Sequence, residues 1–354
     1  MTVTLTNAQG TFDITGIVST AALSGEVRQC CRTLDLEVVS SPYDEHVPAV
    51  DCAVGSAVSL YEGGALRFSG YIFSRTKTTV GGLMDLHCYD RGIYLRKNQT
   101  SRRVDGVTPE QVTAAICSEY GIPAGAIAKT GVTVRRIFVG ASLYEIIATL
   151  YTEAAKTTGK AYQIGFDGDR LTVREKGPQA GAVLIETGRN LTEASTTESA
   201  EEIVNRVSIQ DADGKTLNVL SDEESIRTFG LMGQVLKQSK QDLTGQAKKM
   251  LEESAGVSQK ITVGVLGGVS AATGGAVLMH EEYTGLYGLF YIDADTHTWK
   301  NGVQTAKLTL NLKAVMDETE AGKVIEEAKA ASSAQSVSTV AAGGQWEYPK
   351  KKEK

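Results

Sequence analysis

The sequence has little of several residue types on which many functions depend. Its 354 residues include only 6 prolines and 4 histidines, and 6% of them are aromatic. It also has no apolar run near the roughly 18 residues that a membrane helix needs, so we expect no membrane segment. The first residues, MTVTLTNAQGTFDIT, lack a basic start followed by an apolar stretch, so we expect no signal peptide.

Positive charge is not in excess either. Lys and Arg number 36 against 42 Asp and Glu, which gives a net charge of -6 and a sequence pI of about 5.5. Because no cationic field covers the molecule, we expect no stable binding to nucleic acid. The short basic end, PKKKEK (349–354), is interpreted as a solvated terminus.

The five cysteines are odd in number and contain no C-x-x-C pair. A disulfide framework and a zinc knuckle are therefore both unexpected, and reduced thiols in a cytoplasmic product fit best. Because alternation along a strand buries every second residue, we expect at most one of the adjacent cysteines to be buried. The five are Cys30, Cys31, Cys52, Cys88 and Cys117.

Glycine is abundant, with 37 residues spread among short runs in which Thr and Val alternate with other residues. This pattern indicates a β-rich protein with tight turns. Residues 31–39 alternate well, and residues 55–79 have a hairpin pattern with its turn at Glu62-Gly-Gly. Because no helix pattern interrupts these strands, we assign residues 1–97 to a first small β-barrel.

Helix start signals appear in the middle of the chain. Thr108, followed by Pro and then Gln at the third helical position, is typical of a capped helix. A second helix is predicted from Ser142 to Gly159, because apolar residues recur there at helical spacing. Residues 161–175 then predict a β-hairpin. We therefore assign residues 98–195 to an α+β domain with two helices and a hairpin.

The last third returns to strand patterns. Short helices are predicted at 221–230 and 242–255, and we assign residues 196–315 to a second β-barrel with bracing helices. After Val315 the chain becomes charged and helix-forming, so residues 316–354 are predicted to be a C-terminal helix and a flexible tail. The predicted fold class is β-rich α+β: two small tube-type β-barrels, an intervening α+β domain, and a helical or flexible C-terminal tail.

One stretch, YIDADTHTWKNG (291–302), suggests a metal site, because Asp293, Asp295 and His297 recur at every second position. On a strand these side chains share one face but stand about 7 Å apart. Zinc ligands must converge on one ion at about 2 Å, so one strand cannot supply all three. Asn301-Gly302 is the strongest short hairpin signal, and we interpret the stretch as one arm of a hairpin.

A two-residue turn at this hairpin creates a conflict. Lys300 would pair with Val303, and Asp295 would then face Leu308 on the apolar side of the strand. We therefore expect a β-bulge or a longer loop near Asp293–His297 that shifts the register and removes the conflict. We also expect His297 to be hydrogen-bonded in the barrel wall.

The other motifs favour no catalytic or binding chemistry. DADG (211–214) has its glycine two places too early for an EF-hand loop, so a turn is the better interpretation. The glycine-rich stretch 264–275 lacks the Gly-Lys-Ser/Thr of a phosphate-binding loop. No G-x-S-x-G occurs, and the histidines fall on separate elements: His46, His87, His280 and His297. We predict no enzyme activity, no cofactor, and no catalytic, cofactor-binding or metal-binding residues.

Several stretches occur in a characteristic order. The first part contains FDITGIVS, RTLDLEVV, GSAVSLYEGGALRFSGYIFSR and YDRGIYLRKNQT; the middle contains TPEQVTAAICSEYGIPAGAI and SLYEIIATLYTEAAKTTGKAYQI; the end contains SIRTFGLMGQV and YIDADTHTWKNGVQTAKLTLNL. Together they resemble the baseplate hub proteins of contractile phage tails, of the XkdQ/YqbQ type of Bacillus prophage-like elements. The chain departs from the family at Val303-Gln304, where a histidine is expected.

The resemblance implies a structural protein with two small β-barrels, one near each end. In such hubs three chains form a ring of six barrels around a channel, which adapts a sixfold tail tube to a threefold spike. The implied partners are further copies of the chain, the tail tube protein, the spike protein, baseplate wedge proteins and, as a further candidate, the tape measure protein. The implied location is the tail particle, assembled in the bacterial cytoplasm. Interfaces between copies are expected on residues 55–79, 291–312 and 242–255.

Two other functions remain open. Residues 108–175 are similar in outline to small wall-binding domains, which would make the chain a peptidoglycan- or carbohydrate-binding tail-tip module. Several of the aromatic residues there are predicted on buried helix faces, which weakens this alternative. A hydrolase fused to the hub is the third hypothesis, but only about 40 residues follow the second barrel, too few for a catalytic domain.

Overall fold

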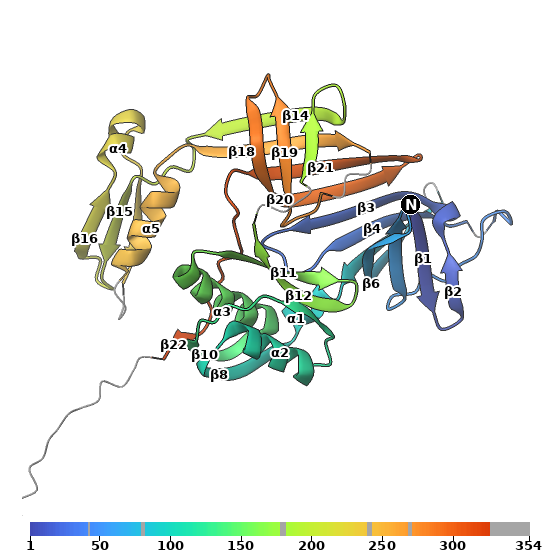
Figure 1. Cartoon of the computed structure of the whole chain (residues 1–354), viewed down its shortest axis with the longest axis horizontal. Coiled ribbons are helices and arrows are strands. Elements are labelled where there is room, and N and C mark those ends of the chain that lie inside the picture. The colour runs from blue at the N-terminus through green and yellow to red at the C-terminus, as the bar shows by residue number, and fades with distance from the viewer. Residues whose placement is uncertain (42, 79–81, 178–181, 239–242, 268–270, 326–354) are drawn as a thin grey trace, which may run out of the picture.

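The computed structural model describes residues 1–41, 43–78, 82–177, 182–238, 243–267 and 271–325. Three parts stand out in Figure 1: a large twisted sheet, an α+β layer below it in this view, and a small unit that projects to the left. The predicted β-rich character is confirmed. No helix in the described part of the chain has the length and apolar character needed to cross a membrane.

The N-terminal strands alternate between core and solvent. In β4 (Thr33–Val39), Leu34, Leu36 and Val38 point into a buried apolar cluster. The predicted hairpin at Glu62-Gly-Gly is confirmed, with Gly63 and Gly64 at φ of 55° and 81°. The other strands are β1 (Thr2–Asn7), β2 (Gly10–Asp13), β3 (Val18–Glu26), β5 (Ala57–Glu62), β6 (Ala65–Lys77) and β7 (Leu83–Asp90). The short helices η1 (Thr15–Ile17) and α1 (Gly92–Lys97) were not anticipated.

The C-terminal strands enclose a second apolar cluster. Its buried side chains come from alternate positions such as Ile261, Val263 and Val265. The hairpin at Asn301-Gly302 is confirmed: both residues have positive φ, 53° and 75°, and Lys300 pairs with Val303. The strands are β13 (Val183–Glu186), β14 (Leu191–Ser199), β18 (Ser258–Leu266), β19 (Ala276–Glu281), β20 (Leu286–Lys300) and β21 (Val303–Asn311).

The two ends of the chain share one sheet. Strand β20 has 15 residues, and while its first part pairs with β19, its last part pairs with β3 from Ala294↔Glu26 to Lys300↔Thr20. The resulting 13-stranded path runs β14-β18-β21-β20-β3-β4-β7-β6-β5-β1-β2, with β13 and β19 beside it. Among the described residues no pairing closes either half upon itself, so the predicted two closed barrels are not confirmed.

The α+β layer contains both predicted helices. In α2 (Pro109–Glu119) Thr108 and Gln111 form a capping box, and in α3 (Leu143–Thr158) Ser142 and Glu145 form another. Helix α3 supplies more of the core of this layer than any other element, including Leu143, Ile147 and Tyr151. The strands are β8 (Gln99–Val107), β9 (Ala124–Ile127), β10 (Val134–Ser142) and the predicted hairpin β11 (Ala161–Asp167) and β12 (Arg170–Lys176).

A small outboard unit is inserted between β14 and β18. Its three-stranded sheet packs on one side against a helix through a small cluster containing Val207, Ile209 and Ala247. The helix predicted at 242–255 packs on strands of its own unit, and its bracing of one barrel against the next stays a prediction. The elements are β15 (Arg206–Gln210), β16 (Thr216–Ser221), α4 (Glu223–Phe229), β17 (Gly233–Lys237) and α5 (Thr244–Ser254).

The segment after Val315 is not helical where the structure describes it. Residues 316–322 run as coil over α3, and β22 (Lys323–Val324) pairs with β10. The helical composition of this segment is overridden because its carbonyl and carboxylate groups bond to the α+β layer. Residues 326–354, the rest of the predicted helix and tail, lie outside the described residues.

Candidate functional site

The Asp293–His297 stretch lies where the two halves of the large sheet meet. The expected irregularity is confirmed, because the β20–β21 register shifts between Ile292 and Ala294 and leaves Asp293 unpaired. Its carboxylate accepts a hydrogen bond from Asn311 Nδ2 at 3.0 Å. The expectation that this irregularity would move Asp295 away from the apolar face is wrong. The bulge lies on the far side of Asp295 from the turn, so Asp295 still faces Leu308.

Asp295 is tolerated in the core because every polar demand of its carboxylate is met. Arg32 donates to both carboxylate oxygens, at 3.2 and 2.5 Å. Thr273 donates from its backbone N at 2.7 Å and from its hydroxyl at 2.5 Å. Burial raises the pKa of Asp295, but the hydrogen bond from His297, the Arg32 guanidinium and Thr273 outweigh burial and hold the pKa at about 2.

His297 is hydrogen-bonded as expected. Its Nε2 donates to the Ala271 carbonyl at 2.8 Å and lies 3.3 Å from Asp295 Oδ2. The structure therefore brings Asp295 and His297 together but leaves Asp293 apart. Within the described ranges, no three His, Cys, Asp or Glu side chains are grouped as a metal site. The arrangement ties β20, the segment at Thr273 and the start of β4 into one joint.

A polar cleft of about 360 Å³ adjoins this joint. It is lined by the end of β3, the β11–β12 hairpin and the segment 271–276, so all of these meet around it. Burial raises the pKa of Asp90 to about 6, although backbone N–H groups of Arg32 and Gly92 donate to its carboxylate. Burial lowers the pKa of Lys176, whose Nζ donates to the Val315 carbonyl. The cations around the cleft already have protein partners, so it has the character of a joint between parts of the fold.

The solvent side of the large sheet is polar across both halves. Cross-strand rows continue through the β3–β20 seam, for example Lys307–Thr296–Ser24–Thr33. Two hollows of about 330 and 440 Å³ lie on this face. Its side chains are mostly small and carry both charges: Thr20, Ser24, Thr33, Asp35, Glu37, Asp85, Thr262, Thr296, Thr298, Lys300, Thr305 and Lys307. We call this surface the polar face.

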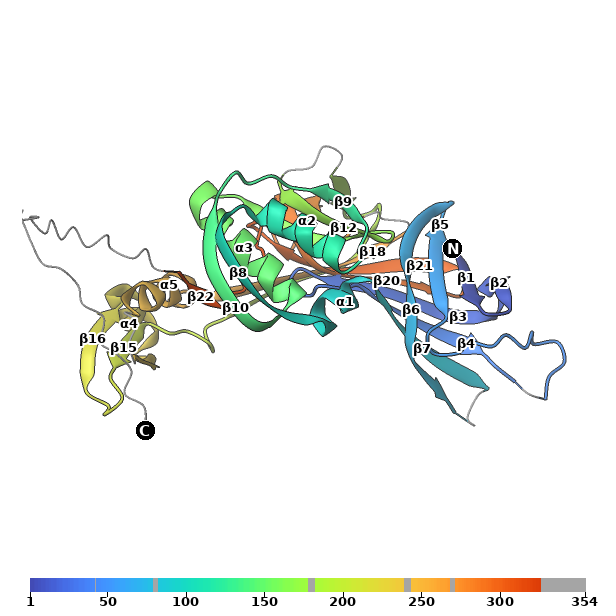
Figure 2. The ribbon, with the colours of Figure 1, turned by 90° about the horizontal axis from the view of Figure 1, so that it is seen from below.

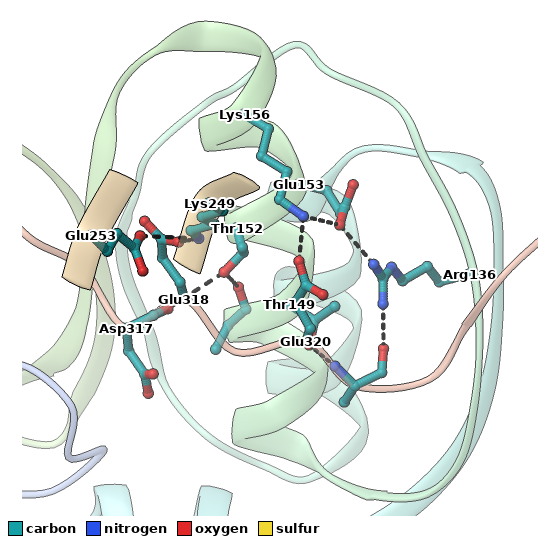
Figure 3. Close-up of polar contacts among 12 residues, drawn as sticks. Arg136, Thr149, Thr152, Glu153, Lys156, Lys249, Glu253, Asp317, Glu318 and Glu320 are labelled. Atoms are coloured by element: carbon teal, nitrogen blue, oxygen red, sulfur yellow. Dashed lines mark hydrogen bonds and ion pairs between the residues drawn. The ribbon is translucent and has the colours of Figure 1, made fainter. Parts of the chain in front are cut away.

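A C-terminal strap, residues 315–324, fastens the end of the large sheet to the α+β layer (Figure 3). Tyr144 donates its hydroxyl hydrogen to Asp317 at 2.7 Å. Arg136 is nearly buried and donates to the Ala321 carbonyl and to Glu153, both at 2.7 Å. These contacts explain why a segment with helical composition is extended here.

The strap also reaches the outboard unit. Figure 3 shows Lys249 of α5 between Glu318 of the strap and Glu253 of its own helix. Lys156 bridges Glu320 at 2.5 Å and Glu153 at 3.1 Å on the other side. One chain segment therefore contacts the large sheet, the α+β layer and the outboard unit.

The remaining sequence motifs have structural roles. DADG (211–214) is the turn between β15 and β16, where the Asp211 side chain accepts from Asp213 N and Lys215 N. In the glycine-rich stretch, Ala271 and Thr273 serve the joint, while residues 268–270 lie outside the described residues.

The histidines and cysteines form no shared site. His87 pairs with Asp35, His280 makes a tilted ring contact with Tyr287, and His46 lies in an exposed loop. All five cysteines are free and buried, so the expectation that one of Cys30 and Cys31 would be exposed is wrong. Both precede β4 in a turn, where strand alternation does not apply.

Sequence reasoning missed Arg32, Thr273 and Arg136, which hold the joint and the strap. Arg32 and Asp295 are separated by 263 residues, and Arg136 and Ala321 by 185. Local spacing carries no signal for such pairs. The available cue was that the two-residue turn places Asp295 on the apolar face of its strand. A carboxylate buried there needs a cationic partner.

Comparison with known proteins places these features in a family. A family model described as YQBQ-like matches residues 21–311. The phage-like element PBSX protein XkdQ of Bacillus subtilis is 24% identical over 312 residues, which cover 85% of this chain and 94% of that protein.

Solved structures show the same fold. The 43 kDa tail protein of prophage MuSo2 from Shewanella oneidensis has a TM-score of 0.68 at 16% identity, covering 91% of this chain and 99% of that chain. The E. coli c3393 protein has a TM-score of 0.53 at 9% identity, covering 88% of this chain and 76% of that chain. The c3393 protein is a component of the type VI secretion system and exhibits structural similarity to the T4 tail proteins gp27 and gp5.

Proposed function

Because this chain belongs to the YQBQ-like family, we propose that it is a structural baseplate hub protein of a contractile tail. Its relatives and fold neighbours indicate a phage tail or baseplate protein. In this proposal three copies form a ring around a central channel and adapt a sixfold tail tube to a threefold spike. The ring belongs to the tail particle and is assembled in the bacterial cytoplasm.

The polar face is the observation that carries this proposal. A surface that guides DNA or protein cargo through a channel must not bind it, so exposed apolar patches and a strongly basic wall are both unsuitable. The polar face has small hydroxyl side chains and both signs of charge across the β3–β20 seam. It also spans both halves of the chain without a break, as the wall of a continuous channel requires.

The contacts within the chain support a structural role. Asp295, Arg32 and Thr273 join the two halves of the sheet, and the strap ties the last strand to the α+β layer. A ring that surrounds a channel needs parts that stay in place relative to one another. The proposed partners are the tail tube, spike, baseplate wedge and tape measure proteins. The similarity of the c3393 protein to the tail proteins gp27 and gp5 supports partners within a tail in general.

The relatives suggest a non-enzymatic role, and nothing in the joint competes with that. Asp295 and His297 bond to protein groups and lie in the core. The wall-binding alternative has no comparable support. Four of the aromatic rings in 108–175, which a sugar-binding platform would need at the surface, lie in the core of the α+β layer: Phe138, Tyr144, Tyr151 and Tyr162.

The oligomeric state tests the proposal. Light scattering of the purified chain, alone and with the spike protein of its particle, should give about 113 kDa, three times 37.7 kDa, for the hub. Negative-stain images should show a ring with a central hole. A chain that stays monomeric with the spike protein present would contradict the proposed function.

A further inference from the structure

A group of exposed aromatic rings ends the polar face. Tyr71 of β6 pairs with Tyr89 of β7, and Phe73 is the bulged residue next to them. The ring centroids of Phe73 and Tyr89 are 5.4 Å apart, and those of Tyr71 and Tyr94 of α1 are 6.3 Å apart. Phe73 is 38% exposed and Tyr94 is 39% exposed, although a monomer gains by burying such rings.

Unneutralised positive charge surrounds these rings. The guanidinium carbon of Arg91 lies 5.9 Å from the Tyr71 ring centroid, and its Nη2 donates to the Tyr71 hydroxyl. Arg96 and Lys97 are exposed at the end of α1, and neither has an ion-pair partner among the described residues. Exposed Tyr and Arg side chains are the types that dominate binding energy at protein interfaces. We call this surface the basic aromatic patch: Tyr71, Phe73, Arg91, Tyr94, Arg96 and Lys97.

The β14 edge of the large sheet has the opposite charge. Strand β14 carries Glu193 and Glu198, and the chain continues directly into Glu201 and Glu202. All four are exposed, and none has an ion-pair partner within the residues that the structure describes. The cation on the neighbouring strand is Lys260, opposite Thr197. We call the four glutamates the acidic edge.

The acidic edge also coincides with an open strand. In the described part of the chain β14 pairs with β18 alone, so the backbone groups along its other side have no strand partner. The strand has nine residues and contains neither Lys nor Pro. An open strand edge is a surface on which another chain can settle.

We propose that the basic aromatic patch of one copy docks on the acidic edge of the next copy. The inference rests on the proposed ring and identifies the two surfaces that meet in it. A ring requires head-to-tail contacts between different surfaces, and Figure 1 shows β14 at the top of the large sheet and α1 below the sheet, beside the α+β layer. We assign the partner of each surface to a second copy of this chain because the basic aromatic patch and the acidic edge carry opposite charges. Every copy presents both surfaces.

Charge reversal tests the contact. Arg96→Glu with Lys97→Glu turns the patch acidic, so the concentration at which half the chain is assembled should rise at least about tenfold. Glu193→Lys with Glu198→Lys should have the same effect from the other side. Assembly of the wild type should weaken as the salt concentration rises, because these charges are exposed. Analytical ultracentrifugation measures all three.

Combination of the four substitutions in one chain provides the decisive measurement. Each interface then places the two acidic substitutions of the patch opposite the two basic substitutions of the edge, so assembly should recover from the loss that either reversal causes alone. Lys129→Glu with Arg170→Glu is the matched control, because it makes the same change in net charge at exposed positions of the α+β layer. Far-ultraviolet circular dichroism confirms that each variant is folded.

The outcomes separate this inference from the proposed function. If the wild type assembles and both reversals leave assembly unchanged, the patch and the edge do not meet, while the hub function stands. If folded single reversals fail and the fourfold variant also fails, charge complementarity is refuted. If reversal leaves the trimer intact but blocks incorporation into tails, the occupant is a different tail protein. A wild type that never assembles contradicts both.

Discussion

A charged side chain in the core of the sheet is the most consequential single-residue feature of this protein. Removing an ion from water costs several kcal/mol, so Asp295 is compatible with folding only while its partners remain in place. Arg32, Thr273 and His297 supply them from distant parts of the chain. The buried charge therefore favours one register of the β3–β20 pairing. Any other register would leave the Asp295 carboxylate buried without its partners.

Replacement of Asp295 by Asn tests this at the residue scale. The substitution keeps the shape but removes the charge that Arg32 bonds, and it should lower the free energy of unfolding by about 2–4 kcal/mol. Asp35→Asn is the control, since the Asp35 side chain is 54% exposed beside His87 and its loss should cost less than about 1 kcal/mol. Urea unfolding measures both. Equal effects would show that Asp295 contributes no more than a surface pair.

The Asp295 carboxylate should also make the free energy of unfolding depend on pH in the acid range. Its pKa is about 2 in the folded protein against 3.8 for an unperturbed Asp. Because the folded pKa is the lower one, the stabilisation is present above pH 4 and is lost as pH falls through 2, on the order of 2 kcal/mol. The difference in unfolding free energy between wild type and Asp295→Asn should therefore shrink over this range. A constant difference would contradict the assignment.

At the scale of elements, local signals predicted local structure. The capping residues Thr108 and Ser142 and the turn at Asn301-Gly302 act within four residues, and all three predictions are confirmed. Strand partners are chosen by long-range packing, so the β3–β20 pairing left no mark in the sequence pattern. The strap was predicted as a helix because its composition favours one, while its bonds to α3 and β10 decide the outcome.

Gly322 shows how closely the strap is fitted. Its φ is +71°, and an added Cβ would lie 2.6 Å from the Ile137 carbonyl oxygen. Gly322→Ala should therefore weaken the docking of β22 by about 1–3 kcal/mol, through both strain and contact. Hydrogen exchange of the Ile325 amide, which bonds to the Arg135 carbonyl, reports this directly. Gly188→Ala is the control, with φ of +80° but open space around the Cβ. If both variants exchange alike, the contact with Ile137 does not matter.

At the scale of the whole molecule, the fold separates a continuous sheet from a unit attached to it. Figure 2 shows the outboard unit standing away from the strands that carry the polar face. The outboard unit has a small apolar core that is separate from the other cores. Among the described residues, the ion pair that joins it to the rest of the chain is the exposed pair of Lys249 and Glu318. Exposed pairs contribute at most about 1 kcal/mol. The folding of the large sheet therefore does not depend on this unit.

Excision of the outboard unit tests that separation. Strands β14 and β18 remain paired up to Ser199 and Ser258, whose hydroxyl donates to the Ser199 carbonyl at 3.1 Å. Replacing residues 200–257 with Asn-Gly should close them into an ordinary two-residue hairpin. The shortened chain should unfold cooperatively within about 5 °C of the wild type, since a change of 1 kcal/mol shifts Tm by only a few degrees in a chain of this size. Scanning calorimetry measures this, with the full chain as reference. A broad transition, or aggregation on purification, would show that the unit is part of the cooperative core, and the sheet could no longer be treated as self-sufficient.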